Sequence, residues 1–354
     1  MSSEKKRALI TGITGQDGAY LARFLLEKGY EVFGTVRRVS TPNFWRLQDL
    51  GILDKIILIS ADLSDMSSLT EAIHESNPNE IYNLAAHSFV GSSFNQPMYS
   101  ADINGIGLLR ILEIVRTFNP KIKVYQASTS ELFGDSNEVS LLQNEKTPFK
   151  PNSPYALSKL FSYELSRIYR NSYGIFVCNG ILFNHESPLR GMEFVSRKIT
   201  NEVAKIKFGI SNELKIGNLD AKRDWGYAPE YVESMWKIMQ HHKPDDFVIS
   251  TGETHSVREF VEEAFKIARL NWKEYVKVDD QHKRLYELPY LRGDFSKAKE
   301  ELGWESKVKF NELVKIMVDA DLKRWEKSLN GESFPWDAIN HSEGVKYFYR
   351  SKEK

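Results

Sequence analysis

The sequence has one cysteine, no excess of charge of either sign and no long hydrophobic run, and each absence excludes a class of protein. A single thiol cannot form a disulfide within the chain. Because Cys178 lies in the apolar run 175–178, we expect it to be a buried structural residue rather than a nucleophile. The 48 basic and 48 acidic side chains cancel. Bulk charge therefore gives no reason to expect nucleic acid or an anionic membrane as a partner.

The sequence also indicates neither a membrane-spanning protein nor a metal site. No apolar stretch approaches the roughly 18 residues that a transmembrane helix needs. Charged residues 1–7 run directly into the first predicted strand, so we expect a cytoplasmic protein without a signal peptide. His255 and His282 lack partners at the spacing of zinc ligands, and no metal is predicted.

The chain has 354 residues, more than one hydrophobic core usually supports, so two lobes are expected. Strands are predicted at 6–11, 31–36, 55–60, 80–83, 123–127 and 176–181, with helices between them at 19–28, 67–76, 97–118 and 154–173. This alternation is typical of an α/β protein with a doubly wound parallel sheet. We expect a Rossmann domain formed by 1–184 and 220–252, which includes a helix at 229–240 and a strand at 246–250. A smaller mixed α/β lobe should comprise 185–219 and 253–354.

Three glycines, Gly12, Gly15 and Gly18, follow the first predicted strand and open the first predicted helix. Glycines at this turn let the backbone approach a pyrophosphate, and the helix N-terminus supplies N–H donors and a favourable dipole. An ordinary tight turn is the alternative. The position of the motif near the start of a strand–helix–strand pattern favours a dinucleotide site.

The end of the second predicted strand indicates which dinucleotide binds. An NAD site usually has an acidic residue there to hold the ribose hydroxyls, whereas this chain has Arg37 and Arg38. Two guanidiniums suit a 2′-phosphate, so NADP is expected. Asp62 and Leu63 follow the third strand and could hold the adenine end. Residues 84–88 follow the fourth strand, where the order of the sheet reverses and ligands collect.

Four side chains indicate proton-transfer chemistry. Tyr155 and Lys159 are four residues apart in a predicted helix and share a face. A lysine ammonium should lower the pKa of the phenol and make Tyr155 a general base. Thr129 and Glu131 follow a predicted strand and alternate along it, so both could face one pocket.

These motifs resemble those of extended short-chain dehydrogenase/reductases, and more narrowly of the GDP-mannose 4,6-dehydratase family. The resemblance covers about 6–325 and includes TGITGQDG, YQASTSELFG, SPYALSK, CNGILFNHESP, RDWG and TGETHSVREF. It implies that residues 1–184 and 220–252 bind NADP and that the smaller lobe binds a GDP-sugar.

The resemblance also assigns residues to roles. It implies a catalytic set of Thr129, Glu131, Tyr155 and Lys159. The implied NADP contacts are Gly12, Thr14, Gly15, Gln16, Asp17, Gly18, Arg37, Arg38, Asp62, Leu63, Leu84, Ala85, Ala86, Ser88, Tyr155, Lys159, His185 and Arg190. The implied GDP-sugar contacts are Asn184, Lys198, Arg223, Arg284 and Glu287.

The implied reaction is the loss of water from a GDP-manno sugar, GDP-mannose, to give a 4-keto-6-deoxy product. The sugar is oxidised transiently by bound NADP. Glu131 favours a lyase, because an epimerase or reductase of this fold needs no such carboxylate. The chain departs from the family pattern at Phe89, where a histidine is usual, and at 284–287, where Arg-Pro-x-Glu is usual. These departures leave GDP-manno-heptose open as the substrate, and an NADP-dependent epimerase or reductase remains a further alternative.

The segment 37–46 carries Pro42, Phe44 and Trp45. Apolar rings on a cofactor loop are costly in water, and an exposed apolar patch usually marks a partner surface. We therefore expect a homo-oligomer with this loop at an interface, and a tetramer rather than a dimer. The alternative is that the rings fold back onto their own domain.

Overall fold

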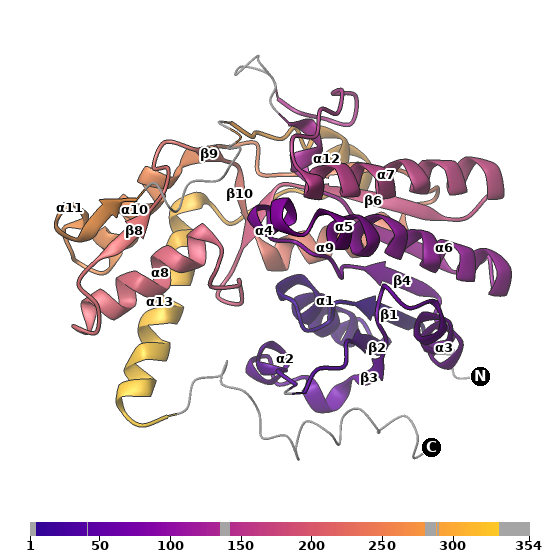
Figure 1. Cartoon of the computed structure of the whole chain (residues 1–354), viewed down its shortest axis with the longest axis horizontal. Coiled ribbons are helices and arrows are strands. Elements are labelled where there is room, and N and C mark those ends of the chain that lie inside the picture. The colour runs from indigo at the N-terminus through magenta and orange to yellow at the C-terminus, as the bar shows by residue number, and fades with distance from the viewer. Residues whose placement is uncertain (1–4, 41, 135–141, 280–287, 289, 333–354) are drawn as a thin grey trace.

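A computed structural model describes residues 5–40, 42–134, 142–279, 288 and 290–332. Its centre is a sheet of seven parallel strands in the order β11-β6-β5-β4-β1-β2-β3 (Figure 1). The strands are β1 (Arg7–Thr11), β2 (Glu31–Val36), β3 (Ile57–Ser60), β4 (Glu80–Asn83), β5 (Lys123–Ala127), β6 (Val177–Leu182) and β11 (Phe247–Ile249). The predicted doubly wound parallel sheet is therefore confirmed.

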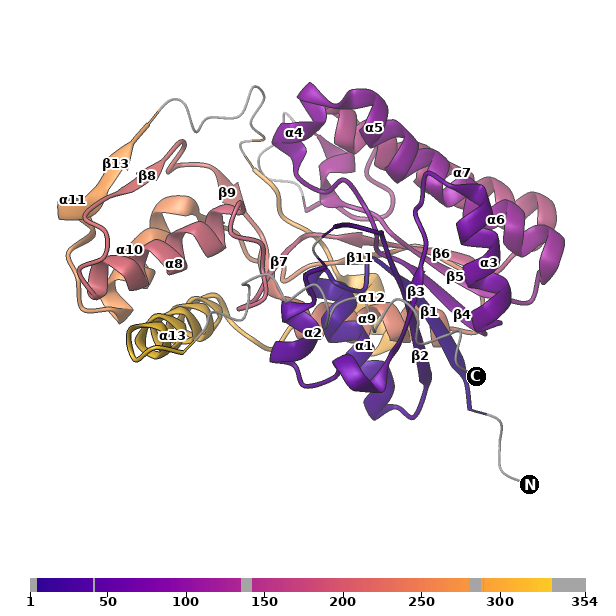
Figure 2. The same cartoon turned by 60° about the horizontal axis from the view of Figure 1, so that its bottom comes forward.

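Helices cover both faces of this sheet (Figure 2). One face packs against α1 (Gln16–Glu27), α2 (Trp45–Asp49) and α9 (Ala228–Gln240). The other packs against α3 (Met66–Ser76), α6 (Gly107–Phe118) and α7 (Pro154–Tyr173). Cys178 is buried in the first of these cores, and burial raises its pKa to about 12, so the expected structural role of the thiol is confirmed.

The helix predicted at 97–118 is divided in the structure. It consists of α5 (Pro97–Ala101), a π-helical turn η2 (Asp102–Ile106) and α6. Within the turn, the Asn104 amide donates to Ser158 Oγ of α7 at 3.0 Å, and Asn104 Oδ1 accepts from the His87 N–H at 2.8 Å. Such turns are rare and often occur at functional sites, and this one joins α7 to the loop after β4. Between that loop and α5 lies the short helix α4 (Val90–Asn95).

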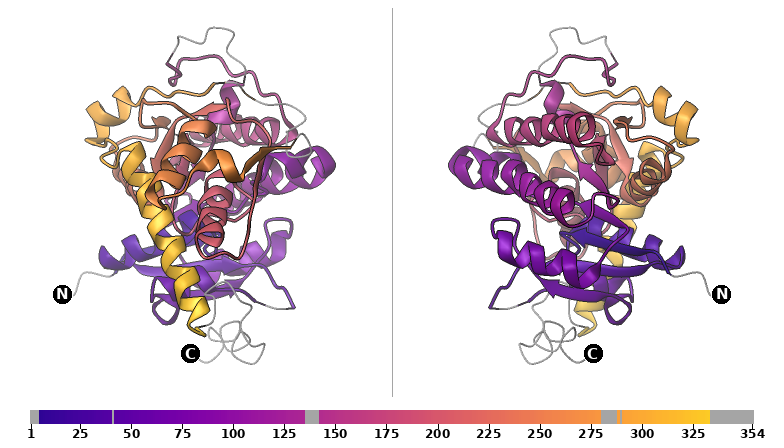
Figure 3. Two further views of the ribbon diagram at one scale, coloured as in Figure 1. Left: turned by 90° about the vertical axis from the view of Figure 1, so that its left-hand side faces the viewer. Right: turned by 90° about the vertical axis from the view of Figure 1, so that its right-hand side faces the viewer.

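The second lobe is built on its own apolar core between three helices. These are α8 (Val195–Lys207), α10 (Val257–Ile267) and α13 (Phe310–Leu329), the last shown in yellow in Figure 3. Short strand pairs complete the lobe: β8 (Leu214–Ile216) with β13 (Val276–Val278), β9 (Lys222–Arg223) with β12 (His255–Ser256), and β7 (Asn184–Glu186) with β10 (Trp225–Tyr227). The small helix α11 (Trp272–Tyr275) precedes β13.

The boundary between the lobes stays a prediction. Although α12 (Ser296–Leu302) falls within 253–354 by number, it packs against β11 and α9. Ala298 and Trp304 belong to the core of the Rossmann domain. Among the described residues, no helix has both the length and the apolarity to span a membrane.

The expectation of exposed aromatic rings in the segment 37–46 is wrong. Phe44 is 3% exposed and Trp45 8%, and both belong to the core that includes α1 and β2. The Arg46 guanidinium lies 4.5 Å from the Trp45 ring centroid, and that of Arg324 from α13 lies 5.9 Å away. The rings therefore fold back onto their own domain, since packing there removes more apolar surface from water than exposure on a loop would.

Candidate functional site

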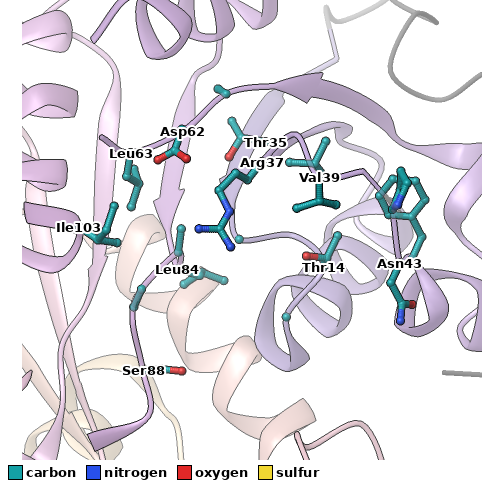
Figure 4. Close-up of a pocket in the computed structure, with 18 of the residues that line it drawn as sticks. Thr14, Thr35, Arg37, Val39, Asn43, Asp62, Leu63, Leu84, Ser88 and Ile103 are labelled. Atoms are coloured by element: carbon teal, nitrogen blue, oxygen red, sulfur yellow. The ribbon is translucent and has the colours of Figure 1, made fainter. Parts of the chain in front are cut away.

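The cavities gather at the carboxyl ends of the parallel strands, where β1 and β4 are neighbours and the connections run in opposite directions. This is the place where open α/β sheets bind ligands. The first cavity has a volume of about 450 Å³ and is shown in Figure 4. It brings together most of the expected NADP contacts: Gly12, Thr14, Gly15, Arg37, Asp62, Leu63, Leu84, Ala85, Ala86 and Ser88.

The glycine motif fits a phosphate because side chains would fill the space that it leaves. Gly12 has φ +70°, and a Cβ there would lie 2.8 Å from the Ala85 backbone. A Cβ at Gly18 would lie 2.4 Å from the Gly12 carbonyl oxygen. Gly15 precedes α1 and provides no side-chain cap, so the first N–H groups of the helix remain available to an anion.

Arg37 and Arg38 do not share one position. Arg37 lines the cavity, and its guanidinium donates to Tyr99 Oη of α5 at 2.7 Å. Arg38 is described in the structure, is exposed, and does not line this cavity. Tyr99 also lines the cavity, and sequence reasoning missed it because 62 residues separate it from Arg37.

A second cavity, of about 150 Å³, brings the expected catalytic set together. It is lined by Thr129, Glu131, Tyr155 and Lys159, and by Asp17, Asn184, His185 and Arg190. Thr129 precedes the 3₁₀ helix η3 (Ser130–Phe133), and its Oγ1 accepts the Glu131 N–H at 3.2 Å. Tyr155 and Lys159 share a face of α7, whose N-cap is Ser153 and which has Pro154 in its first turn. The Thr129 side chain also lies near the Tyr155 phenol and opposes the rise of its pKa on burial.

The expected low pKa of Tyr155 is wrong for this structure. Burial raises the pKa of Tyr155 to about 12, and the nearby Glu131 carboxylate acts in the same direction. Lys159 Nζ donates to the Ala127 carbonyl at 2.8 Å, and burial lowers its pKa to about 8. The sequence pattern predicted the proximity of the two residues but not their desolvation, which disfavours the charged form of each.

Asp17 and His185 form an ion pair that sequence reasoning did not predict. His185 Nε2 lies 2.8 Å from Asp17 Oδ2, and His185 Nδ1 lies 2.8 Å from the Phe183 carbonyl oxygen. Both ring nitrogens therefore face acceptors, which favours the imidazolium, and the Asp17 carboxylate raises the pKa of the buried His185 against desolvation. The histidine in turn lowers the pKa of Asp17. Because 168 residues separate the partners, no local pattern indicates the pair.

Two further residues of the glycine motif, Gln16 and Gly18, contact other parts of the protein and do not line the first cavity. The Gln16 amide donates to the His185 carbonyl at 3.1 Å and accepts from Ser187 Oγ at 2.7 Å. Gly18 packs against Gly12 and Ile13. Gln16 thereby fixes the start of α1 against residues 185–187, whereas Gly18 lets α1 begin close to the turn after β1.

Two of the expected GDP-sugar contacts line a third cavity of about 110 Å³, which is bordered by β7, β8, β9, β10 and the start of α8. Asn184 and Arg223 line it, as do Arg190 and Phe194. Arg223 is 6% exposed and donates to the Leu288 carbonyl at 2.7 Å. Lys198 is half-buried on α8, and burial lowers its pKa. Arg284 and Glu287 lie outside the described residues.

The sheet order, the glycine motif and the Tyr155–Lys159 pair define an extended short-chain dehydrogenase/reductase. A family model described as GDP-mannose 4,6 dehydratase matches residues 9–317. The chain belongs to the GDP-mannose 4,6-dehydratase family.

Individual relatives agree with this assignment. The chain is 50% identical to GDP-mannose 4,6 dehydratase 1 of Arabidopsis thaliana, with 90% of each protein covered. It is 48% identical to the GDP-mannose 4,6 dehydratase of Homo sapiens, with 91% of the chain and 93% of that protein covered.

Among solved structures, dTDP-glucose 4,6-dehydratase from Streptomyces venezuelae with NAD and TYD bound has a TM-score of 0.79 at 22% identity. The match covers 91% of this chain and 98% of that one. RMD from Pseudomonas aeruginosa complexed with NADPH has a TM-score of 0.74 at 21% identity, covering 90% and 100%. At these identities the likeness concerns the fold alone.

The Asp17–His185 pair generates a prediction about stability and pH. The His185 pKa is raised in the folded protein. Its contribution to the free energy of unfolding is therefore fully present below pH 6.5 and is lost as pH rises through the folded pKa. The Asp17 pKa is lowered in the folded protein. Its contribution to the free energy of unfolding is therefore present above pH 3.8 and is lost as pH falls through the folded pKa. Asp17→Asn should therefore destabilise the protein most between pH 3.8 and 6.5, by about 3–5 kcal/mol for a buried pair.

Thermal unfolding followed by circular dichroism across this pH range measures the difference. Asp220→Asn is the matched control, because Asp220 pairs with Arg258 on the surface with its side chain 78% exposed. The control should differ little from the wild type at any pH. If the difference in unfolding temperature between Asp17→Asn and the wild type grew above pH 8, the assignment of a protonated His185 would be contradicted.

Proposed function

We propose that this chain is a hydro-lyase that converts GDP-mannose to its GDP-4-keto-6-deoxy product, with NADP held throughout and regenerated in each turnover. The observation that carries the proposal is the Glu131 carboxylate in one cavity with Thr129, Tyr155 and Lys159. The relatives named GDP-mannose 4,6 dehydratase favour this substrate and reaction over GDP-manno-heptose, and over epimerisation or reduction.

The cofactor site supports a nicotinamide dinucleotide, since similar folds are described with NADPH or NAD bound. The motif from Gly12 to Gly18 would hold the pyrophosphate, and Asp62 and Leu63 the adenine end. We favour NADP because β2 is followed by Arg37 at the cavity and ends in no acidic residue. When bound, NADP would accept a hydride from carbon 4 of the sugar and return it to carbon 6.

The first proton transfer is assigned to Tyr155, which takes the proton of the sugar's 4-hydroxyl. Thr129 lines the same cavity, and its hydroxyl would hold the sugar's oxygen beside Tyr155. The base must be a phenolate, and positive charge favours that form. Burial raises the pKa of Tyr155 to about 12, and the positive charge of Arg190 opposes that rise. Lys159, with a pKa of about 8, is mostly protonated at pH 7.

The elimination is assigned to Glu131. The ketone at carbon 4 makes the neighbouring proton on carbon 5 acidic, and the carboxylate removes it. The carboxylic acid so formed gives this proton to the departing 6-hydroxyl, so that one water leaves and Glu131 returns to its starting state. A single carboxylate thus serves as base and then as acid. Once carbon 6 is reduced, carbon 5 needs a proton, and the proton that Tyr155 took from the 4-hydroxyl would supply it. This step restores Tyr155 to its starting state.

The nucleotide end of the substrate is assigned to the third cavity. Asn184 and Arg223 line it, and Lys198 lies on α8. A guanidinium and an ammonium suit a diphosphate. Arg284 and Glu287 belong to the same proposal by family resemblance.

We further propose a homo-oligomer, a tetramer rather than a dimer, with α7 at one contact. On this helix Leu157 is 60% exposed, Phe161 44% and Ile168 48%. At positions i, i+4 and i+11 they lie on one face of the helix. Exposed apolar side chains on one helix face are typical of a protein interface and suit a self-complementary contact.

The reaction is tested with purified protein, GDP-mannose and no added reductant. We expect a product lighter by one water, measured by mass spectrometry, and no net consumption of NADPH. Glu131→Gln should lower the rate by about 10²–10⁴ while it still permits oxidation at carbon 4. Tyr155→Phe should block both steps. Undiminished exchange of the carbon 5 proton with deuterated solvent in Glu131→Gln would remove Glu131 from the role of base.

The cofactor preference is tested by replacement of Arg37. A charged hydrogen bond contributes about 1.5–3 kcal/mol, so Arg37→Ala should weaken NADP binding by about 10- to 150-fold relative to NAD. Equilibrium dialysis with each dinucleotide measures the ratio. Arg38→Ala is the neighbouring control and should change it little. Equal affinity of the wild type for NADP and NAD would contradict the proposed preference for NADP.

The proposed assembly is tested by introducing carboxylates on the exposed face of α7. The double replacement Leu157→Asp and Ile168→Asp should reduce the molar mass in light scattering to a smaller assembly, because association would bury two carboxylates. Ile210→Asp provides the control, since Ile210 is 44% exposed on the second lobe. A monomeric wild type, or an assembly that the α7 charges leave intact, would refute this contact.

A further inference from the structure

The loop 187–191 runs from β7 towards α8 and carries Arg190 into the site. Arg190 lines both the second and the third cavity, and its guanidinium lies 3.7 Å from the centroid of the Phe194 ring. Leu189 is 1% exposed and packs in the core of the Rossmann domain. Ser187 Oγ donates to Gln16 of α1 at 2.7 Å. The loop therefore contacts both lobes, and its Arg190 side chain lines the reaction cavity.

Three successive carbonyls of this loop accept hydrogen bonds from two arginines outside it. Arg197 Nη1 donates to the carbonyls of Pro188 at 2.7 Å and Arg190 at 3.1 Å. Arg46 Nε donates to the carbonyl of Leu189 at 2.7 Å. Arg197 belongs to α8 of the second lobe and Arg46 to α2 of the first, so the loop backbone is held from both sides.

Each of these arginines is anchored at its other end. Arg197 is fully buried and pairs with Asp321 of α13, with contacts of 2.7 and 2.8 Å. Arg46 Nη1 donates to the carbonyl of Thr14 at 3.1 Å. Thr14 lies in the glycine motif and lines the first cavity. A single guanidinium thus bonds both the dinucleotide motif and the loop that carries Arg190.

This arrangement concentrates positive charge beside the glycine motif. Burial lowers the pKa of Arg46 to about 10, and Arg197 and Arg190 act in the same direction. Arg46 nevertheless remains charged at neutral pH. Apolar side chains could join the lobes without this electrostatic cost, whereas guanidiniums fix backbone direction through planar, multiple donors.

We propose that Arg46 and Arg197 are positioning residues, which hold Arg190 in the reaction cavity in a fixed relation to the glycine motif. Arg46 acts on both the dinucleotide site and the loop, whereas Arg197 acts on the loop alone. The inference rests on the proposed NADP-dependent dehydration, because it assigns the two residues to different parts of that function.

The division of contacts sets the expected outcomes. Arg46→Met should weaken NADP binding by about tenfold or more, since it releases Thr14 and Leu189 together, and should lower kcat as well. Arg197→Lys should lower kcat by a similar factor and leave NADP affinity within about twofold, because a lysine ammonium cannot hold two carbonyls and a carboxylate in one plane. Arg46→Lys should recover part of the NADP affinity.

Dialysis binding of NADP, steady-state rates with GDP-mannose and thermal unfolding are measured for each variant. Arg170→Met is the matched control, because Arg170 forms a partly buried pair with Asp246 away from the loop. It should lower the unfolding temperature and leave NADP affinity and kcat unchanged below that temperature. The lysine variants keep the charge and guard against a methionine variant that does not fold.

The proposal is overturned if Arg46→Met and Arg46→Lys bind NADP as the wild type does, or if both arginines behave like Arg170. It is equally overturned if Arg197→Lys loses NADP affinity as strongly as Arg46→Met. Failure of the proposed function is distinct, because the wild type itself would then neither bind NADP nor release water from GDP-mannose. That result would overturn the positioning roles too.

Discussion

The close approach of backbone at the glycine motif is the constraint on which the rest of the site depends. A side chain at Gly18 would lie 2.4 Å from the Gly12 carbonyl, and one at Gly12 would lie 2.8 Å from the loop after β4. Only glycine lets α1 begin this close to β1. The same start of α1 carries Asp17 to His185, and so fixes the distance between the sheet and the second lobe. The dinucleotide site and the packing of the two lobes therefore both depend on the close backbone approach at the glycine motif.

Catalytic geometry follows from the parallel sheet. Thr129 and Glu131 come just after β5, and His185 comes from β7, which begins shortly after β6 ends. Adjacent parallel strands end at one edge of the sheet, so short extensions beyond them meet without long loops. Tyr155 and Lys159 reach the same cavity from α7, which packs beside those strands. A rigid frame thus places groups of different chemistry within one small volume.

Sequence alone predicted the features that are local and the features that the motifs carry. The strands from β1 to β6 and the helices α3 and α7 were recognisable because apolar runs and helical periods are short-range signals. Exposure was not predictable for Phe44 and Trp45, since a ring on a loop may face either solvent or core. The pKa of Tyr155 was misjudged because desolvation depends on neighbours that sequence spacing does not reveal. The partners of His185 and Arg46 were not predictable either, because they are distant in sequence.

The strand order has a consequence for how the chain is made. Every residue of β6 is buried, and one of its edges pairs with β11, which is synthesised after residues 183–246. At 5–20 residues per second, synthesis of this interval takes roughly 3 to 13 seconds. During that time the nascent sheet has an open apolar edge able to pair with another chain. A chain that ends before β11 would therefore leave this edge of β6 without its partner strand.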